Sequence, residues 1–209
     1  MCLKKIVLSL VVMIVLGLSG GTCLVPVQAK SAVYDNKTMG ISFSSPDGWV
    51  ATSGETFQGM ITKTIDDITK TPDQAAQRMG VLTVFSQYPL NTKNKSNPSI
   101  TLVAELINAL GTESKVDYAK KYLNTINVMG KNMKVVRNPK PVTINKCAGV
   151  TFMYESTVNM GTLDINLKYL VYIFFKNNIS FTISCADKSE TFNKNIKLFE
   201  TSIKTFTMR

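Results

Sequence analysis

Four basic residues cluster in the second half of the chain, where a helix is expected to give way to a strand. Ammonium and guanidinium groups gathered in this way can bind phosphate or carboxylate groups of an anionic polymer or an anionic lipid surface. A solvated surface is the simpler interpretation, and the sequence leaves both open. The residues that would form the anionic-partner patch are Lys131, Lys134, Arg137 and Lys140.

The acidic counterparts are Asp66, Asp67 and Asp164. Two adjacent carboxylates without further oxygen ligands make only a weak cation site, because calcium needs six to eight oxygens. The sequence therefore predicts no metal site.

Histidine is absent from all 209 residues. This excludes a Ser-His-Asp or Cys-His nucleophile system, a histidine general base and every zinc site that needs imidazole. The sequence also contains no Gly-rich phosphate loop, no acidic calcium loop and no Ser-x-x-Lys at a plausible helix start. We therefore predict a non-catalytic protein without catalytic residues or cofactors.

The first 29 residues have the pattern of a secretory signal peptide. A positively charged start precedes an apolar run over residues 6–16, a glycine-rich break over 17–21 and the small residues Val27 and Ala29. The run is shorter than the roughly 18 residues needed for a permanent transmembrane helix. We expect cleavage after Ala29, leaving residues 30–209 as a single secreted domain that is not integral to a membrane.

Two other fates of this segment remain open, an uncleaved anchor and a lipoprotein with its lipid on Cys23. The residues before Cys23, Gly20-Gly21-Thr22, match the lipoprotein pattern only loosely. Cleavage after Ala29 would remove two lysines and no acidic residue, so the net charge of +10 would become +8. In an exported protein this charge favours an anionic envelope polymer, a lipid surface or a protein partner over nucleic acid, although solubility alone would also explain it.

The mature chain alternates short strands with a few capped helices. One helix should follow Thr71 and end at Gly80, and another should begin at Ser114 and end at Gly130. The last helix should carry a cap from Asp187 and Glu190, with its apolar stripe on Phe192, Ile196, Phe199 and Ile203. Strands are expected at 32–35, 41–44, 81–88, 99–106, 133–138, 141–144, 148–159, 162–177 and 178–185, although the apolar residues of 99–106 also fit a helix that continues to Leu110. Tight turns at Met160-Gly161 and Asn177-Asn178 would pair Asn159 with Thr162 and Lys176 with Ile179. This order predicts an α+β domain built on an antiparallel sheet flanked by helices.

The stretch YDNKTMGISFSSPDGW, residues 34–49, together with this order of elements resembles the start of PsbP-like domains. The likeness continues through NPSITLVAE, a helix containing DYAKKYL, a three-strand meander and a carboxy-terminal amphipathic helix. It implies an α/β/α sandwich, as in photosystem II extrinsic proteins, Ran-binding Mog-type proteins and exported bacterial proteins. Most members act as binding or assembly factors. Metal sites of plant members rely partly on histidine, so no metal ligand carries over.

Trp49 follows the turn residues Ser45-Pro46-Asp47-Gly48, which should drop the indole onto the sheet as a core residue. An exposed ligand platform is the alternative.

The expected meander puts two strand spacings between Cys147 and Cys185 and places them on opposite faces of the sheet. We therefore predict no disulfide between them.

The function that these features favour is a secreted, non-catalytic binding or assembly domain of the bacterial cell envelope. An extracytoplasmic carrier with a small-ligand pocket between sheet and helices is the alternative. A histidine-free hydrolase is the third possibility.

Overall fold

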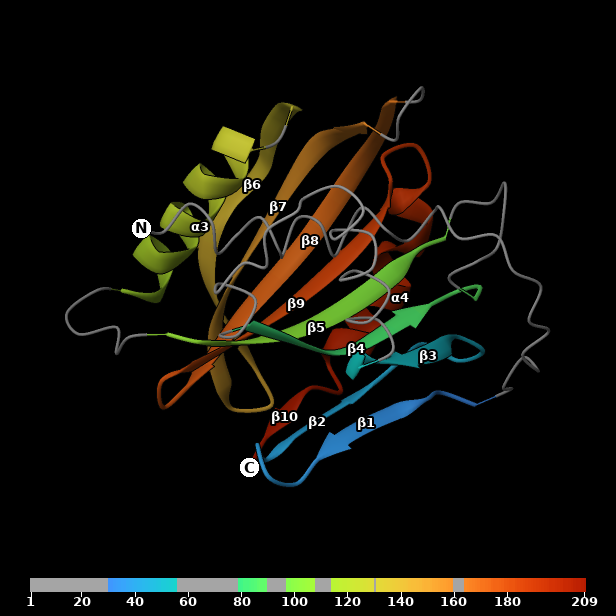
Figure 1. The fold of residues 1–209 in the computed structure, drawn as a ribbon, viewed down its shortest axis with the longest axis vertical. Helices are drawn as coiled ribbons and strands as arrows, with labels where there is room; N and C mark the ends of the chain where they lie inside the picture. The colour runs from blue at the N-terminus through green and yellow to red at the C-terminus, as the bar shows by residue number, and fades with distance from the viewer. Residues whose placement is uncertain (1–29, 56–78, 90–96, 108–113, 130, 160–163) are drawn as a thin grey trace, which may run out of the picture.

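The computed structural model describes residues 30–55, 79–89, 97–107, 114–129, 131–159 and 164–209, which form two antiparallel sheets with helices α3 and α4 (Figure 1). The larger sheet has seven strands in the order β3-β4-β5-β9-β8-β7-β6. Its strands are β3 (Val50–Ser53), β4 (Met79–Ser86), β5 (Ser99–Leu106), β9 (Ile179–Lys188), β8 (Asp164–Lys176), β7 (Cys147–Asn159) and β6 (Lys131–Ile144). The smaller sheet consists of β1 (Val33–Asn36), β2 (Ile41–Ser44) and β10 (Thr207–Met208).

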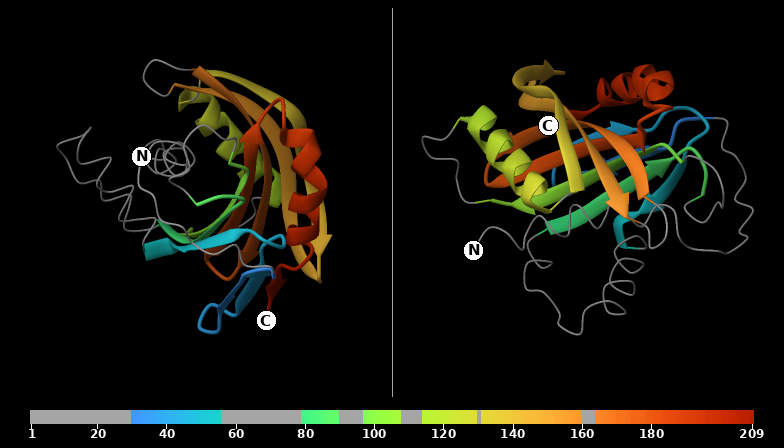
Figure 2. Two further views of the ribbon diagram at one scale, coloured as in Figure 1. Left: turned by 90° about the vertical axis from the view of Figure 1, so that its right-hand side faces the viewer. Right: turned by 90° about the horizontal axis from the view of Figure 1, so that it is seen from above.

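The two helices lie on opposite faces of the larger sheet (Figure 2). Helix α3 (Lys115–Met129) buries Ala119, Leu123 and Ile126 against one face, where they pack with apolar side chains of β7 and β8. Helix α4 (Phe192–Ile203) buries Phe192, Phe199 and Ile203 of the predicted stripe against the other face, together with Phe43 of β2, while Ile196 is partly buried. The α+β class and the α/β/α layering are therefore confirmed.

The predicted cap of α3 is present. The Ser114 hydroxyl accepts the Asp117 N–H at 3.1 Å and donates to the Asp117 carboxylate at 2.6 Å. These contacts satisfy one of the free N–H groups of the first turn. The Ser114 hydrogen bond, followed by the nearby Lys120 ammonium, lowers the pKa of Asp117.

The predicted cap of α4 is wrong. The helix begins at Phe192 after Thr191, whereas Asp187 belongs to β9. The Asp187 carboxylate is buried and accepts hydrogen bonds from Asn195 Nδ2 at 2.9 Å and from the Lys188 N–H at 2.8 Å. Asp187 thus ties the sheet to the second turn of α4 through a side chain, which the local spacing does not reveal.

Trp49 is a core residue, as predicted, with 3% of its surface exposed. The Trp49 N–H donates to the Pro46 carbonyl at 3.3 Å, and Gly48 takes the positive φ of 75° that this tight turn needs. The turn places the indole against Phe199 of α4, with ring centres 6.0 Å apart at 86°. An exposed ligand platform is therefore excluded.

Several strand boundaries differ from the prediction. The segments 133–138 and 141–144 are one strand, β6, and β4 runs from Met79 to Ser86 with Gly80 inside it. Asn159 pairs with Asp164 instead of Thr162, so the connection is two residues longer than the predicted tight turn. The Lys176–Ile179 pairing is confirmed, with Asn177 at φ 54° in the turn. The short strands β3 and β10 were not predicted.

Cys147 and Cys185 are separated as predicted but lie on the same face of the sheet, not on opposite faces. Both thiols are free. Cys147 and Cys185 lie on β7 and β9, which flank β8, but both side chains belong to the core on the α4 face. Their positions along β8 also differ. Cys185 pairs with Leu170, whereas Cys147 precedes the first β7–β8 pair, which joins Gly149 to Phe174. Burial, followed by the nearby Glu200 carboxylate, raises the pKa of the Cys185 thiol.

Other predictions fall outside the described residues, namely the helix after Thr71, the stop at Gly130 and the signal segment 1–29. Within the part of the chain that the structure describes, no helix is both long and apolar enough to span a bilayer.

Candidate functional site

All four predicted basic residues belong to β6, which is an edge strand of the larger sheet. Their backbone partners on β7 are every second residue of that strand and therefore share one face of the sheet. One of these partners, Met153, belongs to the core under α4, so the shared face is the α4 face. We call the four residues the β6 basic row: Lys131 opposite Thr157, Lys134 opposite Glu155, Arg137 opposite Met153 and Lys140 opposite Thr151.

Three irregularities in the pairing produce this alignment. They fall between Lys131 and Lys134, between Val135 and Arg137, and between Arg137 and Lys140. Residues three apart in a regular strand point to opposite faces. Each β-bulge adds one residue to β6, so three residues of β6 span two residues of β7 and the basic positions return to the same face.

The described side chains of the row differ in burial. Lys134 and Lys140 are exposed, whereas Arg137 is half-buried. Arg137 Nη2 donates to Thr151 Oγ1 at 3.5 Å, while its Nε is buried and has no hydrogen-bond partner among the described residues. The Lys131 side chain lies outside the described part of the chain. Sequence reasoning found the cations but missed Thr151, because its proximity to Arg137 depends on the bulged register.

The half-buried guanidinium lies within electrostatic reach of Tyr172 on β8. Burial raises the pKa of Tyr172, the nearby Cys185 and Glu200 raise it further, and the Arg137 cation lowers it. The acidic neighbour of Lys134, Glu155, is already paired with Lys168 at 2.8 Å. The positive charge of the row is therefore not cancelled by the carboxylate beside it.

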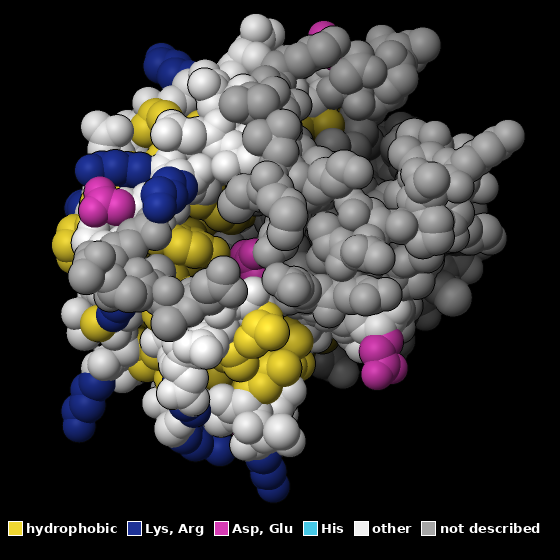
Figure 3. Space-filling view, turned by 60° about the vertical axis from the view of Figure 1, so that its left-hand side comes forward, with side chains coloured by type: hydrophobic (Ala, Val, Ile, Leu, Met, Phe, Trp, Pro, Cys, Tyr) yellow, Lys and Arg dark blue, Asp and Glu magenta, His cyan; other side chains and the backbone are white. Residues whose placement is uncertain are grey.

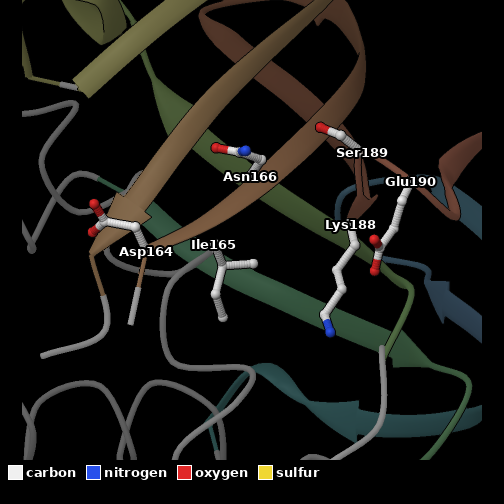
Figure 4. Close-up of a pocket in the computed structure, with 6 residues that line it drawn as sticks. All are labelled: Asp164, Ile165, Asn166, Lys188, Ser189 and Glu190. Carbon is white, nitrogen blue, oxygen red and sulfur yellow. The ribbon is translucent and has the colours of Figure 1, made fainter. Parts of the chain in front are cut away.

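A separate pocket lies where β8 begins and β9 ends (Figure 4). Its volume of about 340 Å³ is near the lower limit for small-ligand sites. The described part of this pocket does not lie between the sheet and α3 or α4, where a carrier pocket was expected. Its described lining carries charges of both signs and consists of Asp164, Ile165, Asn166, Lys188, Ser189 and Glu190.

The acidic residues do not form a metal site in the described part of the chain, where no group of three or more potential ligands occurs. Asp164 is exposed at the pocket, and Asp66 and Asp67 lie outside the described residues.

Buried phenols form a second polar group that sequence reasoning missed. Tyr154 and Tyr169 stack with ring centres 4.6 Å apart under α3, and burial raises the pKa of both. They therefore stay protonated at neutral pH. Nearby, the half-buried Tyr118 hydroxyl donates to Glu105 Oε2 at 3.3 Å.

Basic side chains also occur away from β6. Figure 3 shows Lys and Arg side chains along one border of the molecule, with apolar side chains between them. On α3, Lys120 and Lys121 are both exposed, and Lys120 pairs with Asp117 at 3.2 Å. These two lysines provide a matched comparison for the β6 basic row, because they carry the same charge on the opposite face.

A scan against protein families gives no match, and neither does a search of curated proteins. Among solved structures, the chain is similar to the cyanobacterial PsbP (CyanoP) of Synechocystis sp. PCC 6803, with a TM-score of 0.57 and 15% identity over 90% of this chain and 98% of that one. The Ran-binding protein Mog1p of Saccharomyces cerevisiae gives a TM-score of 0.46 and 10% identity over 87% and 96%. LpqN, involved in cell envelope biogenesis of Mycobacterium tuberculosis, gives 0.46 and 6% over 85% and 84%.

Proposed function

The chain has a PsbP-like fold, and on that premise we propose that it is an exported, non-catalytic domain that binds an anionic component of the cell envelope. The β6 basic row is the binding surface. The observation that carries this proposal is the bulged register of β6, which lines up cations that a regular strand would place on alternate faces. A fold of this kind does not specify a function by itself, so the proposed function depends on this surface.

Two features of the sequence support the proposal. The absence of histidine removes the commonest general base, and the signal-like start accounts for delivery to the envelope, where anionic polymers and lipids occur. The net charge of +8 after cleavage would attract such partners over about one Debye length, roughly 8–10 Å at physiological salt.

Export gives the first testable expectation. When the full chain is expressed in a bacterium that secretes proteins, the recovered protein should begin at Lys30, because the small residues Val27 and Ala29 form the cleavage pattern. Intact mass spectrometry measures this directly. A lipid-modified chain starting at Cys23, or a chain retaining residues 1–29, would contradict it.

Charge reversal on the row tests the binding itself. Replacing Lys134 and Lys140 by glutamate should lower retention on purified cell wall or anionic vesicles by tenfold or more at low salt, because attraction becomes repulsion. The measurement is co-sedimentation of the secreted protein across a salt series. Wild-type binding should fade as salt rises.

The matched control reverses Lys120 and Lys121 on α3, which changes the net charge by the same amount. It should bind nearly as well as wild type, since the lost Lys120–Asp117 pair is exposed and such pairs contribute only about 0–1 kcal/mol to stability. Equal losses of binding in the two variants would show that binding depends on the net charge of the protein and not on the β6 basic row. Absence of wild-type binding at low salt would refute the proposed function.

A further inference from the structure

The described cations of the β6 basic row are evenly spaced. Lys134, Arg137 and Lys140 lie opposite β7 residues that are two apart, and an antiparallel strand rises about 3.4 Å per residue. Successive backbone positions are therefore about 7 Å apart along β7. At the backbone level Lys131 continues the same interval, opposite Thr157.

The described cations of the row form a line along one strand. That strand is an edge of the larger sheet, and the positions of the row belong to the face that also carries α4, whose Lys194 and Lys197 are exposed as well. An anionic bilayer presents charge over a plane, and proteins that bind it usually add apolar side chains that enter the headgroup region. A single row at a constant interval instead fits an extended chain whose own charges recur at a similar distance.

Arg137 differs from the two lysines beside it. Its guanidinium is held against Thr151, with Nη2 3.5 Å from Thr151 Oγ1, and its Nε is left without a partner among the described residues. A guanidinium presents a planar fork that matches phosphate or carboxylate, whereas an ammonium acts as a point charge on a flexible stem. Because the Nε is buried, Arg137 can fix one anionic group only through its Nη groups, while the lysines attract the next group on either side.

From these three observations we infer that the anionic partner is a linear phosphodiester polymer, bound lengthwise along β6 with Arg137 at the centre. This inference rests on the proposed function and narrows its partner from any anionic envelope component to a polymer. Binding several linked phosphates at once makes every contact after the first intramolecular, which can raise affinity by about 10²–10⁴-fold over a single phosphate.

The test uses the secreted protein and poly(glycerol phosphate) chains of graded length. Calorimetric titration should show weak binding of inorganic phosphate, at least 100-fold tighter binding per molecule once three or four phosphates are linked, and little gain per added phosphate beyond that. Vesicles containing phosphatidylglycerol form the second arm and should bind less tightly than the polymer at equal phosphate concentration.

Exchanging two neighbouring residues tests the geometry at constant composition. Val135 pairs with Tyr154 of the α3 face and is 42% exposed, so K134V/V135K moves one cation to the other face without changing the net charge. Affinity for the polymer should fall about tenfold. The exposed Lys140 offers a second variant, K140Q, whose affinity should fall several-fold even if the exchange disturbs the strand, and circular dichroism identifies such a disturbance.

R137K keeps the charge but removes the fork. We expect it to bind the polymer about fivefold or more weakly while the salt dependence changes little, because the number of cations is unchanged. Affinity that does not depend on chain length, or an exchange variant that folds and binds like wild type, would overturn the inference. Binding to vesicles without binding to the polymer would overturn it while leaving the proposed function intact, whereas failure to bind either would overturn both.

Discussion

Replacing Trp49 by alanine should destabilise the domain by about 3–5 kcal/mol, the usual cost of truncating a large buried aromatic side chain. The indole is 3% exposed and meets Phe199 of α4 edge to face. It joins the turn after β2 to the helix layer, so its loss leaves a cavity between these elements. For a domain of this size the melting temperature should fall by roughly 6–20 °C.

The matched variant is Trp49→Phe, which keeps an aromatic ring that can still meet Phe199 and should lose less than half as much stability. Unfolding must be followed by circular dichroism, because Trp49 is the only tryptophan in the chain. A melting temperature within 2 °C of wild type for Trp49→Ala would show that the turn does not hold the helix layer to the sheet.

The parts of the fold that sequence predicted well are those encoded by local periodicity and turn chemistry. The spacing of Phe192, Phe199 and Ile203 defines one helix face, and that face is buried. Ser114 and Asp117 make a cap whose partners are three residues apart, so no knowledge of the rest of the chain is needed. The resemblance to PsbP-like domains, which the fold bears out, depended on the same local signals.

The errors arose where a long-range partner decides the outcome. Asp187 shows a capping pattern with Glu190, yet the sheet extends through Asp187 and turns its carboxylate to Asn195. The faces of the two cysteines were misassigned because β7 and β9 are buried on both sides, so apolar alternation does not say which face is which. Val150 points to the α3 face, whereas Ile183 points to the α4 face.

The candidate site shows the same division between residue identity and geometry. The sequence identified its four basic residues, but their alignment depends on bulges in a strand that the prediction broke into two. A bulge is defined by the pairing with the neighbouring strand. A spacing of three residues in β6 therefore does not show by itself whether two side chains lie on the same face of the sheet. The Arg137–Thr151 contact follows from that register, so it could not be predicted from the sequence either.

Gly149→Ala should lower the free energy of unfolding by about 2–3 kcal/mol. A Cβ at this position would lie 2.5 Å from the Ile173 carbonyl oxygen and 2.7 Å from the nearest ring carbon of Phe174. Phe174 pairs directly with Gly149 and stacks on Phe206 at 4.6 Å, so its ring covers the glycine and cannot move without disturbing the core. Backbone and ring would both have to shift.

Gly80→Ala is the control, because a Cβ at Gly80 meets no atom of the described residues within 4 Å. It removes backbone freedom from the unfolded chain without a clash and should leave stability unchanged or raise it by up to about 1 kcal/mol. Denaturant unfolding of both variants measures the difference, with the midpoint falling for Gly149→Ala and the slope unchanged. Equal midpoints would mean that β7 and β8 can separate locally at little cost. The same flexibility would weaken the fixed spacing of the β6 basic row, because that row takes its register from β7.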